Sequence, residues 1–294
     1  MGMLIAKKYP TKLFLKAADH TYVECGTGGK AWACWGGKTG GTAFNSGAGS
    51  TKRADCIAKP NERAGITCYL VNGVCHQAAN RVLLPAGILV SAARGYSVSS
   101  ALFGTYGKVG FWPCSAPFDQ CPGVSGDLPA CTAKSPSAKS AKPFKSAPAL
   151  EGEDKYNRSI KQAYSKFDHE GATPLDSINF HVDLFDRQVK FRLGEDLGSA
   201  AAKGLRMAKE HAELDHRHMV EALAHDRMLP AEFVKTFNKM TIKFQDDVAS
   251  ALNKKQYLKL LELDRDEKVV LADPDIIKSL YGEATVTEVY GKLK

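Results

Sequence analysis

One short segment near residue 75 places a cysteine where nucleophilic chemistry is possible. An apolar run at residues 66–71 precedes it, Asn72-Gly73 is a turn signal, and Pro85 and Gly87 follow. These signals predict a helix that begins close to Cys75 and ends before Pro85. The first N–H groups of a helix lack intrahelical acceptors, so a thiolate and an oxyanion are both stabilised at that end. A structural or disulfide-bonded cysteine beside a surface histidine is the alternative interpretation.

His20 is the candidate partner of Cys75. It lies in a β-rich stretch that predicts a strand over residues 19–25, followed by a turn at 26–29 and a second strand at 30–35. An imidazole can take the proton of a thiol, and the thiolate then attacks a carbonyl carbon. We therefore predict Cys75 as nucleophile and His20 as base. His76 is the alternative base, but adjacent side chains at a helix start usually diverge.

Two polar residues of the predicted helix are further candidates for the site. Gln77 and Asn80 follow Cys75 closely enough to line the site or to donate to an oxyanion, together with His76. Their alternative role is capping and helix-surface polarity.

The segment Asp19-His20-Thr21-Tyr22-Val23 precedes Gly73-Val74-Cys75-His76, so the order is histidine strand, second strand, cysteine helix. This order resembles the circularly permuted papain-like cysteine hydrolases, the NlpC-related and lecithin:retinol acyltransferase-like group. The resemblance covers about residues 11–110. It implies a small antiparallel sheet with a cysteine-bearing helix, with Cys75 as nucleophile, His20 as base and no cofactor.

The resemblance also implies a third polar residue on the second strand. That strand offers the residues Trp32, Cys34 and Trp35, none of which is a usual orienting group for an imidazole. Other candidates for this role, in a different geometry, are Glu24, Asn45 and Asp55. The aromatic residues Trp32, Trp35 and Tyr96 either wall an acyl or glycan pocket or belong to the core.

All eight cysteines lie within the first 131 residues. They are Cys25, Cys34, Cys56, Cys68, Cys75, Cys114, Cys121 and Cys131. No pair has Cys-x-x-Cys spacing, which disfavours structural zinc, and the last three lie in a Pro/Gly-rich stretch that needs cross-links. We therefore predict disulfides, at Cys114, Cys121 and Cys131 in particular, and a secreted or periplasmic protein.

The composition divides the chain into three parts. We predict an α+β fold with a cysteine-rich papain-like domain at 1–131, a Lys/Ser/Ala/Pro-rich linker at 132–153 and an all-helical bundle at 154–294. In the first part, 36–50 reads as an ordered loop, and 88–90 and 96–106 as strands. The helices of the bundle are predicted at 156–169, 176–193, 199–228, 231–252, 257–263 and 274–281.

The bundle also contains a histidine-rich segment that resembles a metal site in part. His211, His218 and His225 repeat every seven residues, and Glu213 and His216 form one Glu-x-x-His motif. A di-metal bundle needs two such motifs, so we predict a charged, solvated helix face and no metal. The acidic run at 264–267 lacks the calcium-loop pattern and is predicted to be a capped turn.

The charge distribution limits the choice of partners. Residues 1–130 carry 13 Lys and Arg against 6 Asp and Glu, a net charge of +7. This favours an anionic polymer or a peptide as substrate, whereas aromatic residues do not interleave with the basic ones as in nucleic-acid binders. No window approaches 18 continuous apolar residues, so we predict no membrane span.

Two functions follow. The first is a thiol-dependent hydrolase or acyl/amide transferase that acts on amide bonds of peptide or peptidoglycan type. The alternative is a non-catalytic, disulfide-stapled binding module whose helical domain docks a protein partner.

Overall fold

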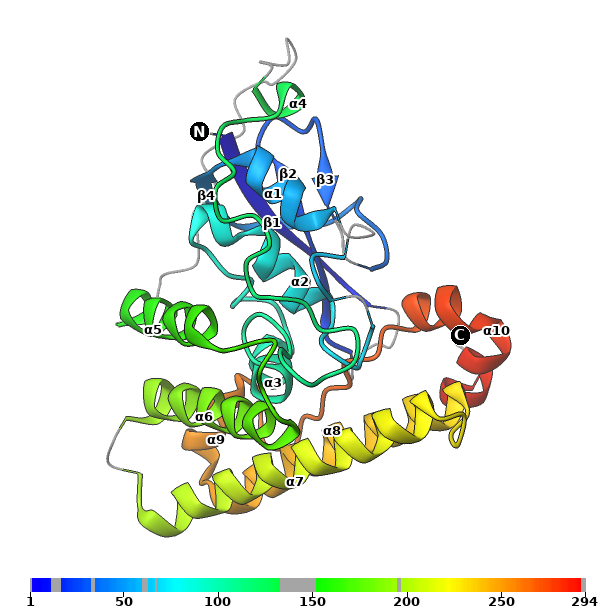
Figure 1. Ribbon diagram of the computed structural model, residues 1–294. Coiled ribbons are helices and arrows are strands. Elements are labelled where there is room, and N and C mark those ends of the chain that lie inside the picture. The colour runs from blue at the N-terminus through cyan, green and yellow to red at the C-terminus, as the bar shows by residue number, and fades with distance from the viewer. Residues whose placement is uncertain are drawn as a thin grey trace.

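The computed structural model describes residues 2–11, 17–32, 35–59, 63–66, 68–132, 152–194 and 197–291. It is a mixed α+β structure in which a small antiparallel sheet with its helices lies above a layer of long helices (Figure 1). The predicted α+β class is therefore confirmed. The predicted linker falls almost wholly on residues 133–151, which are outside the described residues.

The sheet has the order β3-β2-β1-β4. Its strands are β1 (Gly2–Pro10), β2 (Asp19–Cys25), β3 (Ala31–Trp32) and β4 (Thr42–Gly49). The central strand β1 pairs antiparallel with β2, where Tyr9 faces His20, and with β4, where the register shifts between Ala6 and Lys7. Strand β2 occupies the residues predicted for it.

Strand β4 corrects the prediction of a loop at 36–50. Its glycines allow another backbone to come close, because a Cβ on Gly49 would lie 2.7 Å from the backbone nitrogen of Ala86. Glycine content therefore reports a packing contact here and not a loop.

Helices α1 (Thr51–Ala58), α2 (Cys75–Val82), η3 (Leu84–Ala86), α3 (Tyr96–Phe103) and α4 (Pro129–Thr132) complete the N-terminal part. The helix predicted at Cys75 is present, but the strand predicted at 96–106 is wrong. Every residue of α3 is buried, so the segment has no polar face to show a helical period. Residues 88–90 form no strand.

The C-terminal part consists of the predicted helices. They are α5 (Glu153–Lys166), α6 (Pro174–Leu193), α7 (Ser199–Ala224), α8 (Pro230–Ala251), α9 (Lys254–Leu261) and α10 (Pro274–Tyr290). Thr173 caps α6, Asn253 caps α9, and Pro230 is the first residue of α8. Helix α10 extends beyond residue 281, with a kink at Gly282.

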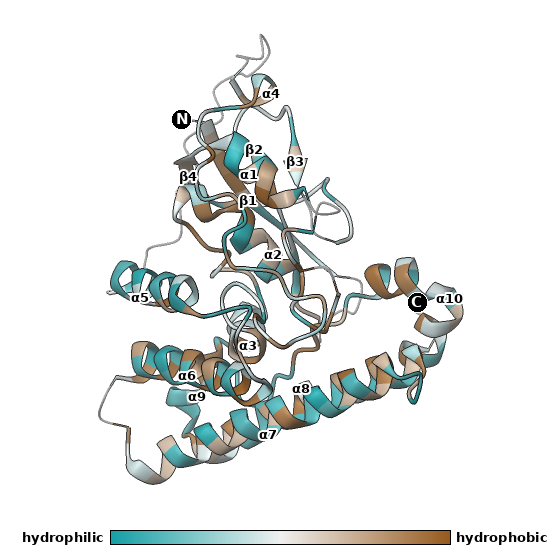
Figure 2. Ribbon diagram, viewed as in Figure 1, coloured by the Kyte–Doolittle hydropathy of each residue, from teal (hydrophilic) through white to brown (hydrophobic). Residues whose placement is uncertain are grey.

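One hydrophobic core joins both parts, with α3 between the sheet layer and the long helices (Figures 1 and 2). Figure 2 shows that α5 is largely hydrophilic. The sheet domain therefore depends on the helical layer for part of its burial.

Three disulfides hold the Pro/Gly-rich stretch against the sheet domain. They join Cys25 to Cys131, Cys56 to Cys121 and Cys68 to Cys114. The prediction that Cys114, Cys121 and Cys131 are disulfide-bonded is confirmed. Closing loops of this length stabilises a fold by about 4–5 kcal/mol each in the chain-entropy account, and the cross-links fit an oxidising compartment.

Helix α7 corrects another prediction. The residues His211, His218 and His225 are exposed as expected, but Glu213 and His216 are buried and not solvated. Glu213 pairs with Lys209 and with Lys108 from the sheet domain, and His216 donates to the Leu70 carbonyl at 2.8 Å. The carboxylate of this motif therefore belongs to a buried ionic cluster that joins the two parts.

Candidate active site

Helix α2 places Cys75 at its first turn. The residue before it, Val74, is extended, and its N–H donates to Gln77 Oε1 at 3.1 Å, which fixes the entry of the chain into the helix. Asn72 anchors the preceding turn by donating to the carbonyls of Gly65 and Cys114 at 2.9 and 2.8 Å. The sulfur thus lies at the positive end of α2, and the side chain is only 5% exposed.

Strand β2 and a glycine turn hold His20 from two sides. The imidazole stacks on Tyr9 at 4.7 Å between ring centroids, and its Nε2 donates to the Gly37 carbonyl at 3.1 Å. Tyr9 in turn accepts from the Gly37 N–H at 3.2 Å. A Cβ on Gly36 would lie 2.8 Å from His20 Cε1, so only glycine lets this turn approach the ring.

The structure places Cys75 near the start of the strand that carries His20, because its Sγ lies 3.9 Å from the Asp19 carbonyl oxygen. Burial alone lowers the pKa of His20, but the charge of Cys75 and the hydrogen bonds with Asp273 and Cys75 outweigh it and raise that pKa to about 10. Nε2 donates to the Gly37 carbonyl, and Nδ1 lies 3.5 Å from Asp273 Oδ2. These neighbours favour the protonated form of His20.

Asp273 is a residue of this site that no sequence pattern indicated. Its Oδ2 lies 3.5 Å from His20 Nδ1, at the edge of hydrogen-bonding distance, and its other oxygen accepts the Asp275 N–H at 2.8 Å to cap α10. It is 198 residues from Cys75 in the sequence. Only an N-cap signal marks it, since an Asp-Pro pair precedes α10.

His76 lines the cavity beside Cys75, but both of its ring nitrogens are engaged in hydrogen bonds. Its Nε2 donates to the Asp19 carbonyl at 2.9 Å, and its Nδ1 accepts from Ser99 Oγ at 2.8 Å. Burial lowers its pKa to about 4, so it is neutral and has no lone pair left for a proton transfer. His76 instead fixes α2 against the start of β2, which positions His20.

Gln77 and Asn80 make their hydrogen bonds with groups other than the sulfur. The Gln77 amide donates to the Gly104 carbonyl at 3.2 Å, and Asn80 donates to the Thr105 carbonyl at 2.8 Å and accepts from Val90 N at 2.9 Å. Both are fully buried, so they are not on a helix surface either. The oxyanion donors of this site would be helix N–H groups of α2 and not these amides.

The residues considered for the third position are bound elsewhere. Trp32 donates to Asp55 at 3.0 Å, and Trp35 donates to the Ile66 carbonyl at 2.9 Å. Asn45 donates to the Leu89 carbonyl at 2.8 Å, Glu24 pairs with Lys7 at 2.7 Å, and Tyr96 is a core residue. Cys34 is outside the described residues. The Gly37 carbonyl takes the orienting role instead, and a backbone group leaves no trace in the sequence.

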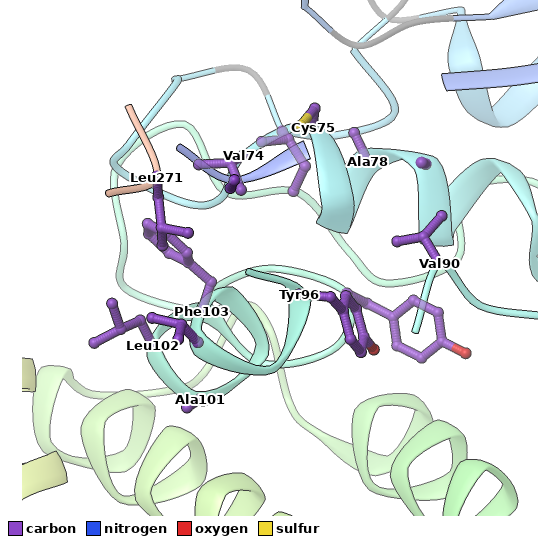
Figure 3. Packing of buried hydrophobic residues seen from close by; sticks show 14 of the residues in the cluster. Val74, Cys75, Ala78, Val90, Tyr96, Ala101, Leu102, Phe103 and Leu271 are labelled. Atoms are coloured by element: carbon purple, nitrogen blue, oxygen red, sulfur yellow. The ribbon is translucent and has the colours of Figure 1, made fainter. Parts of the chain in front are cut away.

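The cavity beside Cys75 has room for about one water molecule. One wall consists of residues near β2 and α2, including Asp19, Tyr69 and His76. The other wall is the segment 270–273, which crosses from the helical layer (Figure 1). Figure 3 shows Leu271 of this segment beside Val74. A substrate cannot reach the sulfur in this arrangement.

Within the described residues, no group of three His, Cys, Asp or Glu side chains could hold a metal ion. None of the described helices is both long enough and apolar enough to cross a membrane. The absence of a cofactor stays a prediction.

We compared the chain with known protein families, curated proteins and solved structures, and none of them matches it.

Proposed function

We propose that this chain is a thiol hydrolase or acyl/amide transferase with the permuted papain-like order of elements. The observation that carries the proposal is the placement of Cys75 at the start of α2, with its Sγ 3.9 Å from the carbonyl oxygen of Asp19, directly before His20, whose Nε2 is held by the Gly37 carbonyl. A nucleophile, a base and a group that orients the base are the parts such chemistry needs. The strand that carries His20, β2, precedes β3, β4, α1 and the cysteine helix α2 in the chain, and a histidine strand before a cysteine helix supports the proposal.

The proposed reaction proceeds through a thioester. The Cys75 thiolate attacks the carbonyl carbon of an amide, and the negative charge moves to the carbonyl oxygen near the N-terminus of α2. The C–N bond then breaks as the His20 imidazolium gives its proton to the leaving amine. Water or an acceptor amine gives a proton back to His20 and attacks the thioester, which releases the acyl product and restores the thiolate–imidazolium pair.

The substrate class follows from the charge and the cross-links. Peptide or peptidoglycan-like amides suit the basic N-terminal part, because an anionic polymer would be attracted to its net charge of +7. The three disulfides favour a protein that acts outside the reducing cytosol, as a secreted or periplasmic protein. The helical part would then dock a protein partner.

The pH profile of Cys75 alkylation tests the proposal. We expect iodoacetamide to label Cys75 at a rate that stays level from pH 8 to pH 6, as the proposed pairing with His20 requires. An isolated thiol loses about tenfold in rate per pH unit in this range. His20→Ala should restore that steep dependence, whereas His76→Gln should keep the level profile. Peptide mapping identifies the labelled cysteine, and Cys75→Ser is the blank.

Turnover of peptide amides gives the second measurement. Cys75→Ala should abolish it, and His20→Ala should reduce it by about two to four decades. A steep alkylation profile in the unmodified protein would contradict the catalytic pair. The non-catalytic, disulfide-stapled binding module would then be the better description.

A further inference from the structure

The segment that closes the site belongs to the chain itself. Residues 268–273 run in extended form between α9 and α10 and supply Val270, Leu271, Ala272 and Asp273 to the cavity wall over Cys75. Leu271, Ala272 and Asp273 are at most 6% exposed, and His20 beneath them is fully buried. This segment is called the cover below.

The sheet domain binds the cover through main-chain hydrogen bonds, as it would bind a peptide. Ala18 N donates to the Val270 carbonyl at 3.2 Å beside a parallel bridge from Ala17 to Val270. The Tyr69 hydroxyl donates to the Leu271 carbonyl and accepts the Asp273 N–H, both at 3.0 Å. These hydrogen bonds involve only main-chain groups of the cover, so an extended peptide of another sequence could form them equally well.

The helical domain holds the cover from its other side. Gln245 of α8 accepts from Val269 N at 3.0 Å and donates to the Val269 carbonyl at 2.8 Å. Tyr290 of α10 donates to the Ala272 carbonyl at 3.0 Å. The position of the cover is therefore set by helices that have no part in the chemistry.

The cover also places an anion on the catalytic base. The Asp273 carboxylate lies 3.5 Å from Nδ1 of His20, the nitrogen that the Gly37 carbonyl leaves free to exchange protons with Cys75 and the leaving amine. A carboxylic acid product would leave a similar anion near this nitrogen. With Asp273 in place, the imidazolium is neutralised and the approach to the sulfur is occupied.

We propose that residues 268–273 are an intramolecular inhibitor that occupies the binding site of an extended peptide substrate and must leave before Cys75 can react. What the cover inhibits rests on the proposed function. That the cover shields Cys75 does not, and accessibility can be measured without any turnover.

The experiment compares rates of Cys75 alkylation by iodoacetamide at pH 7 in the full chain, with peptide mapping. Tyr69→Phe removes the hydroxyl that makes two bonds to the cover, and Gln245→Leu removes both bonds to Val269. We expect each variant to raise the rate at least tenfold, because opening of the cover becomes more frequent.

Two matched variants control for general loss of stability. Tyr164→Phe removes a buried hydroxyl that also bonds one carbonyl and one N–H, those of Gly107 and Tyr106. Gln188→Leu removes a buried amide that bonds the Ser97 carbonyl. Neither residue touches the cover, so we expect both rates to stay within about twofold of the unmodified protein.

Each outcome has one meaning. Two results would contradict the proposal that the cover shields Cys75. One is an equal increase in alkylation rate in the cover variants and their controls, and the other is no increase in a folded Tyr69→Phe/Gln245→Leu double variant. A tenfold increase in alkylation rate with the steep pH profile of an isolated thiol would support the shielding of Cys75 by the cover and contradict the pairing of Cys75 with His20. A level pH profile without any increase in rate would support the pairing and contradict the shielding.

Discussion

His20 is a buried histidine whose pKa is raised, because its neighbours are acceptors or anions. Burial lowers the pKa, yet Cys75 and Asp273 raise it to about 10. A raised pKa means that the contribution of these contacts to stability is present below about pH 6.5 and is lost as the pH rises toward 10. The protonation of His20 therefore affects both its interactions with Cys75 and Asp273 and the stability of the fold.

Glu213 is a buried carboxylate that pairs with two buried lysines, whereas His20 is a buried cationic group with anionic and acceptor neighbours. Lys108 and Lys209 both pair with it, and burial lowers the pKa of Lys108 to about 7 despite the carboxylate. Glu213→Gln leaves two ammonium groups without a counter-charge, so we expect a loss of about 3–5 kcal/mol in the free energy of unfolding. Urea unfolding at pH 6, where both lysines are charged in the unfolded chain, measures it.

Glu210→Gln is the control for that loss. Glu210 lies three residues earlier on α7 and pairs at the surface with Arg206 at 3.1 Å, where both side chains are 43–44% exposed. Such pairs contribute about 0–1 kcal/mol. Similar effects of the two substitutions would show that the buried cluster does not carry the charges as described.

Single residues differ in how far the sequence reveals them. Short local patterns place Cys75 at a helix start and His20 in a strand, and the structure contains both elements. No local pattern indicates Asp273 or the Gly37 carbonyl, because one is distant in the sequence and the other is a backbone group. The buried state of Glu213 and His216 depends on what packs against α7, which no pattern within that helix contains.

Helices and strands are also predictable only where the signal lies within the segment itself. The helices of the C-terminal part have polar outer faces and caps, so the helical spacing of their apolar residues predicts them. Helix α3 has no polar face because α2, α6, α7 and α9 surround it, and the sequence suggested a strand. Strand β4 looks like a loop because its glycines make room for η3.

The disulfide between Cys68 and Cys114 supports the turn that leads into α2. We expect the double variant Cys68→Ser/Cys114→Ser to lose about 4 kcal/mol of stability, from the loop of 46 residues that it closes. Because Asn72 bonds the Cys114 carbonyl, this variant should also raise the rate of Cys75 alkylation. Thermal unfolding and the labelling rate are measured on the same sample.

Cys25→Ser/Cys131→Ser is the matched pair. Its loop of 106 residues gives a slightly larger loss, about 4.7 kcal/mol, but Cys131 lies in α4, away from the site. Its labelling rate should therefore stay unchanged. Equal labelling in both double variants would show that the disulfide at Cys68 does not position Cys75.

At the scale of the whole molecule, buried polar contacts tie the two parts together. The ionic cluster at Glu213, the Gln188 bond to the Ser97 carbonyl and the cover with Tyr69 all cross between them. A composition boundary near residue 132 separates the cysteine-rich part from the helical part in the sequence. It does not reveal that the helices complete the core and close the site.

These contacts also make the fold sensitive to acid. Burial, with a repulsive contribution from Lys108, lowers the pKa of His216 to about 3, and burial lowers that of His76 to about 4 and that of His181 well below its usual range. The unfolded chain binds protons at these histidines near pH 6.5, whereas the folded chain does not. Stability is therefore lost as the pH falls from 6.5 toward 4, at up to about 4 kcal/mol per pH unit for three histidines.

The variant His216→Gln measures how much His216 contributes to this pH dependence of the free energy of unfolding. The glutamine amide can still donate to the Leu70 carbonyl, as His216 does, but it does not titrate. Urea unfolding between pH 6 and pH 4.5 should give a slope smaller by about 1.4 kcal/mol per pH unit, whatever the variant's absolute stability. His211→Gln, an exposed position on the same helix, should keep the original slope. An unchanged slope in His216→Gln would mean that His216 is protonated in the folded protein, and that the core between α7 and the sheet domain admits charge.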